Sequence, residues 1–237
     1  MSAESGVALV IIGHFGFAED HTPSGSSLSY GGSGYACAVG AGAGDPGRVG
    51  VVAHIGADLD LDAIVKLGVD TRGAVRMPGL APRLTITQHS ATERSFRSEL
   101  GVAATPATDA FPIAYASTRH VHLATTPPSE QLHWLRTIRQ RLPGVTVSVD
   151  MFEATAAEFP DASRELCRLA DLVFANEAER RTLFTDHPLP TTDMVLKNGA
   201  HGATLHTGVE ILRAPAPACD VVDTTGAGEV LAGAFLS

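Results

Sequence analysis

The sequence has few cysteines, no long apolar run and no phosphate-binding loop of the Walker type. Its three cysteines, Cys37, Cys167 and Cys219, lie far apart, which excludes a disulfide framework and a CxxC metal pair. This cysteine usage favours a reducing, cytoplasmic setting. The first apolar run, residues 7–12, is too short to span a bilayer or to act as a signal segment. The missing GxxxxGK(S/T) loop argues against a Walker-type NTPase.

Lysine is also rare, and the charge balance is acidic. Only Lys66 and Lys197 are lysines among the 17 basic residues, and the net charge at neutral pH is −9. Such acidity disfavours a non-specific nucleic-acid surface and an anionic membrane surface. We therefore expect a small-molecule substrate and no nucleic-acid or membrane partner. Hydrophobic residues make up 44% of the chain, which is enough for a substantial core in one large domain.

Strand and helix patterns alternate along the chain. Apolar runs typical of buried parallel strands occur at residues 7–13, 48–56, 120–124, 145–150, 171–176 and 193–197. Residues 129–142 have helical spacing around Trp134, which we interpret as packing, and residues 203–215 predict a hairpin. Residues 18–30 are polar and turn-rich, whereas residues 74–100 predict a short antiparallel excursion that could cover a cleft. The pattern as a whole predicts an α/β fold.

Polar side chains follow several of these predicted strands. In a parallel α/β sheet, ligands bind beyond the carboxyl ends of the strands. Asp150, Asn176, Lys197 and the 223–229 loop all fall at such ends. One edge of the sheet should therefore gather an acid, an amide, a base and a glycine-containing loop. For Asp150 two interpretations remain, a contact to phosphate or magnesium and an ordinary helix cap.

The stretch TTGAGE, residues 224–229, is typical of an anion-binding turn that opens a helix. Gly226 and Gly228 permit a tight turn, and the unpaired N–H groups of the following helix favour phosphate. An acid directly after the turn, Glu229, repels an anion, but it suits a base that takes a proton from an attacking hydroxyl. By spacing alone, an ordinary strand-to-helix turn explains the glycines equally well.

Five stretches together resemble a known family. In chain order they are GGSGYACA (31–38), RVGVVAHIGAD (48–58), NEAE (176–179), LKNGAHG (196–202) and DTTGAGE (223–229). They resemble the motifs of the ribokinase-like, or PfkB, family of sugar and nucleoside kinases, and the resemblance covers nearly the whole chain. It implies a three-layer α/β/α sandwich with a mostly parallel central sheet and a small β lid. It also implies a single domain over residues 1–237, with lid segments near 15–30 and 74–100.

The same resemblance implies a reaction, cofactors and residue roles. It implies ATP and Mg²⁺ as cofactors, a sugar or nucleoside-like substrate, and a homodimer through the lid. Glu229 takes the place of the catalytic aspartate, with Gly226, Ala227 and Gly228 as the anion hole. The other implied roles are magnesium binding through water by Asn176 and Glu179, nucleotide contacts by Lys197, Gly199, Gly202 and Thr224, and substrate contacts by Gly31, Gly32 and either Arg94 or Arg97.

Three departures from the family pattern bear on activity. The base is glutamate, and a misplacement of about 1 Å can cost on the order of a hundredfold in rate. Ala36 stands where the family often has asparagine. Ala18 stands where it has a substrate-binding aspartate, with Glu19 and Asp20 just beyond as substitutes. Family members also continue through further helices, so we expect the adenine side to be open, completed by another subunit, or missing.

Three functions remain open from the sequence. The leading prediction is ATP-dependent phosphorylation of a hydroxyl on a small sugar or nucleoside-like compound. The alternatives are a ligand-binding or regulatory protein that has lost this chemistry, and an ATP-independent enzyme that uses Glu229 and the anion hole. Nucleotide use separates them, because only a kinase needs Mg-ATP and releases ADP. The pair His120 and His122 could bind a metal, but no third ligand is visible nearby.

Overall fold

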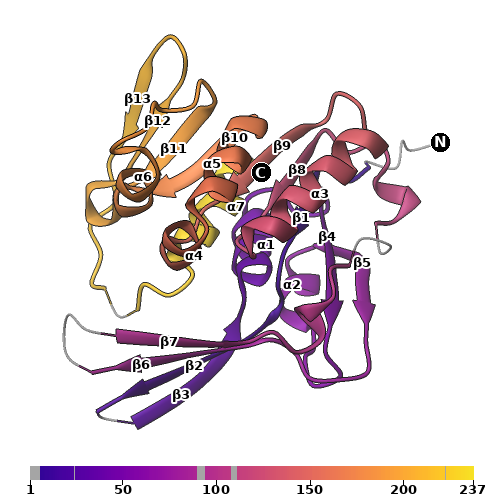
Figure 1. Cartoon of the computed structure of the whole chain (residues 1–237). Helices are drawn as coiled ribbons and strands as arrows, with labels where there is room; N and C mark the ends of the chain where they lie inside the picture. Colours follow the sequence, from indigo (N-terminus) through magenta and orange to yellow (C-terminus); the bar gives the residue numbers. More distant parts are fainter. Residues whose placement is uncertain (1–5, 24, 90–93, 108–110, 222) are drawn as a thin grey trace. The chain divides into compact units, whose positions relative to one another are not determined.

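The computed structural model of the chain (Figure 1) describes residues 6–23, 25–89, 94–107, 111–221 and 223–237. It divides into two compact units: residues 1–118 together with 229–237, and residues 119–228. The expectation of a single domain over residues 1–237 stays a prediction. Among the described residues, no helix combines the length and the apolar composition that crossing a membrane would need.

The first unit contains a parallel sheet in the order β1-β4-β5. Its strands are β1 (Leu9–Ile12), β4 (Val49–Ile55) and β5 (Asp70–Arg76). Residues 74–76 therefore belong to β5 and not to the lid segment expected near residues 74–100. Strands β1 and β4 are almost completely buried, which explains why they are continuous apolar runs. Short helices follow at α2 (Asp62–Lys66), η1 (Gly101–Ala104) and η3 (Ile113–Tyr115).

Two glycine-rich helices of this unit pack through their backbones. Helix α1 (Ser33–Gly44) lies against β1 and β4, and helix α7 (Ala227–Leu236) lies against α1. A Cβ atom on Gly40 would lie 2.1 Å from the carbonyl oxygen of Val230, and one on Gly233 would lie 2.0 Å from that of Cys37. Only glycine fits at these two positions, so the close approach of the helices depends on it.

Four further strands form a separate sheet in the order β3-β2-β6-β7 (Figure 1). They are β2 (Gly16–Thr22), β3 (Gly25–Gly31), β6 (Arg83–Gln88) and β7 (Arg94–Glu99). Residues 18–30, which look turn-rich in sequence, are thus mainly an antiparallel hairpin. The Thr22 hydroxyl donates a 3.0 Å hydrogen bond to the Gly25 carbonyl beside its turn. We call this four-stranded sheet the lid sheet, and the homodimer expected through it stays a prediction.

The second unit contains six strands in the order β13-β12-β11-β10-β9-β8. The parallel strands are β8 (His120–Leu123), β9 (Thr146–Asp150), β10 (Leu172–Asn176) and β11 (Asp193–Lys197). Strands β12 (Ala203–His206) and β13 (Ile211–Ala214) form the predicted antiparallel hairpin. The helices are α3 (Pro128–Arg141), α4 (Glu153–Glu158), α5 (Pro160–Leu169), α6 (Glu177–Phe184) and η4 (Gly199–His201).

Packing in this unit agrees with the sequence periodicity and fixes the strand ends. Trp134 of α3 is only 2% exposed, so its interpretation as a packing residue is confirmed. Asn176 of β10 is in register with Lys197 of β11, and Phe174 of β10 is in register with Asp150 of β9. The polar residues predicted to follow β9, β10 and β11 therefore do lie at one edge of the sheet.

Candidate active site

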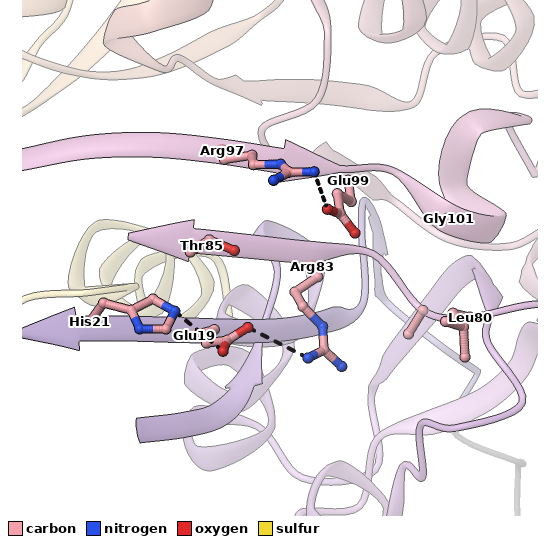
Figure 2. Close-up of a pocket in the computed structure, with 9 residues that line it drawn as sticks. Glu19, His21, Leu80, Arg83, Thr85, Arg97, Glu99 and Gly101 are labelled. Carbon is pink, nitrogen blue, oxygen red and sulfur yellow. Dashed lines mark ion pairs between the residues drawn. The ribbon is translucent and has the colours of Figure 1, made fainter. Parts of the chain in front are cut away.

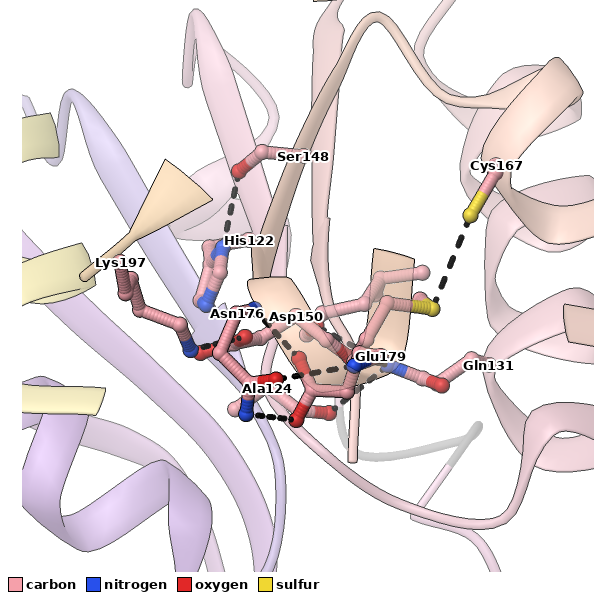
Figure 3. A network of polar contacts seen from close by, with 11 residues as sticks. His122, Ala124, Gln131, Ser148, Asp150, Cys167, Asn176, Glu179 and Lys197 are labelled. Carbon is pink, nitrogen blue, oxygen red and sulfur yellow. Dashed lines mark hydrogen bonds and ion pairs between the residues drawn. The ribbon is translucent and has the colours of Figure 1, made fainter. Parts of the chain in front are cut away.

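A buried ion pair joins the carboxyl ends of β9 and β11 (Figure 3). The Lys197 ammonium donates a 2.6 Å hydrogen bond to Oδ1 of Asp150. The Asp150 side chain is 0% exposed and that of Lys197 is 14% exposed, so each charge needs its partner. Helix α4 begins after Phe152 without a side-chain cap, so Asp150 is not a helix cap. The side-chain amide of Gln131 also donates to the Asp150 backbone carbonyl at 3.0 Å, which fixes the end of β9.

The glycine turn before α7 lies against this lysine. Gly226 has a φ of 74°, a left-handed conformation that favours glycine, and helix α7 begins at the next residue. A Cβ atom on Gly228 would lie 3.1 Å from Nζ of Lys197. The ammonium therefore lies beside the first turn of a helix, where free N–H groups and the helix dipole already favour an anion. The sequence predicts Lys197 and Gly228 near the same sheet edge, but it does not predict that they contact each other.

The fold itself requires glycine at both positions of the predicted substrate motif. Gly32 has a φ of 93°, and a Cβ atom there would lie 2.4 Å from the His14 carbonyl oxygen. That carbonyl accepts hydrogen bonds from the backbone N–H groups of Gly34 and Tyr35 at 3.0 and 3.3 Å. Gly31 ends β3, and a Cβ atom there would lie 2.8 Å from the backbone nitrogen of Ala18 in the neighbouring strand β2. Contacts from Gly31 and Gly32 to a substrate stay a prediction.

The two acids proposed as substitutes for the missing aspartate lie on opposite faces of the lid sheet, because side chains alternate along β2. Glu19 forms an ion pair with Arg83 at 3.5 Å, and its carboxylate lies 3.2 Å from Nε2 of His21. It lines a cavity of about 640 Å³ over β2, β6 and β7 (Figure 2). Asp20 points to the other face and does not line this cavity.

Of the two arginines predicted to contact the substrate, the structure describes the side chain of only one. Arg97 lines the same cavity as Glu19 and pairs with Glu99 at 3.0 Å. The backbone of Arg94 belongs to β7, but its side chain lies outside the described part of the structure.

His120 and His122, which the sequence offered as a possible metal pair, share a hydrogen-bond partner, Ser148, that the sequence did not indicate. Both rings contact one hydroxyl group, because Ser148 Oγ lies 2.7 Å from His120 Nε2 and 2.8 Å from His122 Nδ1. Burial lowers the pKa of His120 to about 4 and that of His122 to about 3, so both rings are neutral. Across the described residues, no cluster of three or more His, Cys, Asp or Glu side chains could hold a metal ion. The sequence could have indicated this contact only if HVHL of β8 and TVSVD of β9 had been assigned to adjacent strands.

Residues 8–237 match the family model of the pfkB family carbohydrate kinases. The chain belongs to the PfkB family. The cytidine kinase of Thermococcus kodakarensis is 27% identical over 246 residues, which cover 97% of this chain and 87% of that protein.

Solved structures of PfkB-type kinases have the same fold. The adenosine kinase from Sinorhizobium meliloti has a TM-score of 0.79 at 18% identity, over 98% of this chain and 86% of that one. A sugar kinase from Pyrococcus horikoshii, solved in complex with ATP, has a TM-score of 0.77 at 18% identity, over 96% of this chain and 83% of that one. The prediction of a ribokinase-like α/β fold with a mostly parallel sheet is confirmed.

The PfkB motif N-x-x-E forms a capping box at the start of α6. Oδ1 of Asn176 accepts a 2.9 Å hydrogen bond from the Glu179 backbone, and the Glu179 carboxylate accepts bonds from the Asn176 backbone and side-chain amide at 2.7 and 2.8 Å. Glu179 is 3% exposed, with both carboxylate oxygens already accepting hydrogen bonds. Oxygen donors of this kind suit Mg²⁺, and their existing bonds fit a contact through water better than direct coordination. A magnesium role for these two residues stays a prediction.

The capping box itself can be tested by stability. Replacing Asn176 with alanine should lower the free energy of unfolding by about 1 kcal/mol, because the N-terminus of α6 loses its side-chain acceptor. Asn176→Ser is the matched control, since serine with Glu179 forms the same type of box. Urea denaturation of the three proteins measures the difference. Equal stability of the alanine and serine variants would show that the cap contributes nothing.

The predicted nucleotide-side residues lie around η4 and the glycine turn. A Cβ atom on Gly202 would lie 2.0 Å from the Ala214 carbonyl oxygen, so the hairpin requires this glycine. Gly199 has a φ of 55°, and a Cβ atom added there would meet no atom within 4 Å. Thr224 is exposed, and its carbonyl accepts a 3.2 Å bond from the Ala227 backbone. Their contacts to a nucleotide stay a prediction.

Proposed function

We propose that this PfkB-family protein transfers the γ-phosphoryl group of ATP to a hydroxyl group of a nucleoside or a related small sugar. The observation that carries the proposal is the glycine turn of residues 226–228, which has the Lys197 ammonium beside Gly228 and Glu229 as the next residue. The named activities of the cytidine and adenosine kinases support a nucleoside. The ATP complex of the sugar kinase supports ATP as the donor.

Each residue in this mechanism has one physical task. Glu229 accepts the proton of the attacking hydroxyl as the new P–O bond forms and the bond between the γ-phosphorus and the bridging oxygen of ATP breaks, which releases ADP. The backbone N–H groups of Gly226 and Gly228 donate to the oxygens of the phosphoryl group, whose charge is spread over them during transfer. The Ala227 N–H, which donates to the Thr224 carbonyl at 3.2 Å, joins them by exchanging that bond for one to the phosphoryl group. Asn176 and Glu179 would hold Mg²⁺ through water, and that ion supplies charge neutralisation along the phosphate chain.

Calorimetry with a non-hydrolysable ATP analogue tests the proposal directly. We expect binding that depends on magnesium, because the phosphate chain and the ion are recognised together. Glu229→Gln is the matched control and should bind the analogue as well as the wild type does, since its carboxylate acts only on the hydroxyl. ADP release should then be measured with a panel of cytidine, adenosine, inosine and free ribose. No analogue binding at millimolar concentration, with or without magnesium, would contradict the kinase proposal.

A further inference from the structure

We propose that Lys197 is a catalytic residue that donates to the transferred phosphoryl group, while Asp150 holds its ammonium beside the glycine turn and His122 presents a neutral ring edge toward it. This inference rests on the proposed kinase function and extends the predicted nucleotide contact of Lys197 to a specific task for its charge. Lys197 is one of only two lysines in the chain.

The position of the ammonium is the first argument. A Cβ atom on Gly228 would contact the end of the lysine side chain, with Nζ, Cδ and Cε at 3.1, 3.5 and 3.6 Å. The ammonium thus lies alongside the turn whose N–H groups face an oxyanion. A full positive charge here adds to the partial charge of the helix N-terminus, and both act most strongly when charge builds up on the phosphoryl oxygens.

Asp150 anchors the ammonium from the sheet side. An ammonium has three N–H donors, and Asp150 accepts one of them at 2.6 Å. The Asp150 side chain is fully buried, and Gln131 ties its backbone to the carbonyl groups of Leu123 and Ala124 at the end of β8. The carboxylate cannot follow a moving lysine, so it fixes where the ammonium can reach.

His122 provides the second, independent observation. Its side chain is 0% exposed, and its Nε2 atom has no hydrogen-bond partner among the residues that the structure describes. A buried polar atom without a partner is unfavourable, so its placement calls for an explanation. Figure 3 shows this ring edge turned toward Lys197 and Asp150. Burial is the largest cause of the low His122 pKa, the charge of His120 is the second and the charge of Lys197 is the third. This third cause places the Lys197 ammonium within electrostatic reach of the His122 ring.

The hydrogen bond to Ser148 limits the His122 ring to two arrangements. The single Ser148 proton can be donated to only one of the two imidazoles, so the hydroxyl accepts from the other. With Nδ1–H of His122 donating to Ser148, the bare Nε2 faces the ammonium, and this tautomer is the one that a nearby positive charge favours. His122 then acts as a positioning residue: a neutral acceptor edge behind Lys197 that adds no competing positive charge.

The test must separate lost chemistry from lost folding. Lys197→Met alone leaves the buried Asp150 carboxylate without its cation, so the informative protein is the double variant Asp150→Leu/Lys197→Met, which removes both charges together. We expect it to fold and to turn over about 10²- to 10³-fold more slowly, with KM for the nucleoside little changed, as for loss of a donor to a transition-state oxyanion. A folded double variant within threefold of wild-type turnover would overturn the proposal.

Two readouts do not depend on turnover. Inorganic pyrophosphate should raise the melting temperature of the wild-type protein and not that of the double variant. An equal shift in both proteins would contradict an anion contact by Lys197. If wild type bound pyrophosphate through Lys197 but released no ADP with any substrate of the panel, the kinase proposal would fail and the anion contact would stand. Nitrogen-15 NMR of His122 should show the proton on Nδ1, and Ser148→Ala should remove this preference; a proton on Nε2 in the wild type would overturn the role of His122.

Discussion

Replacing Glu229 with glutamine should reduce kcat by about 10²- to 10⁴-fold, which is the usual contribution of a positioned general base. Glutamine keeps the size and polarity of the side chain but cannot accept the hydroxyl proton. Binding of the nucleotide analogue should not change, because residues 226–228 retain their N–H groups. The measurement is steady-state ADP release with the best substrate of the panel, together with calorimetry of the same protein samples.

Glu229→Asp is the control that addresses the departure from the family pattern. Aspartate restores the residue that the PfkB pattern normally has, but it shortens the side chain by one methylene group. If the backbone and the bound substrate of this protein are adjusted to glutamate, the aspartate variant should lose roughly a hundredfold in rate, because a misplacement of about 1 Å has that effect. Full turnover by Glu229→Gln would show that Glu229 is not the base.

Breaking the buried ion pair from the lysine side should be the most destabilising of these changes. Lys197→Met leaves the fully buried Asp150 carboxylate without its cation, and removing one member of such a pair costs about 3–5 kcal/mol of unfolding free energy. Asp150→Leu should cost less, because the Lys197 side chain is 14% exposed and can extend its ammonium to water. Urea denaturation of both single variants and of the double variant measures the effect.

The double variant Asp150→Leu/Lys197→Met is the control in this comparison. It should recover most of the stability lost in Lys197→Met, because no uncompensated charge remains in the sheet. The difference between the double variant and the sum of the single variants gives the interaction free energy of the pair. Additive losses would show that the two charges do not stabilise each other in the folded protein.

The parallel strands and the glycine turn could be predicted because their signals are local. A buried parallel strand is a continuous apolar run, and the residue that ends it lies at the sheet edge whatever its neighbours are. For this reason the sequence predicts Asp150, Asn176 and Lys197 at one edge without any knowledge of the strand register. The hairpin of residues 18–30 was harder, because its exposed strands contain many serines and two acids and have the composition of a loop.

The amino-acid sequence alone is enough to predict the PfkB family, the α/β fold and the turn of residues 226–229, since ordered motifs and strand periodicity suffice for these. Which polar groups meet depends on the folded chain. Lys197 and Asp150 are 47 residues apart, and His122 and Ser148 are 26 apart. Contacts of this kind depend on strand order and on the side to which each strand end points. No local pattern contains that information, because it arises only when the strands pair and the core packs.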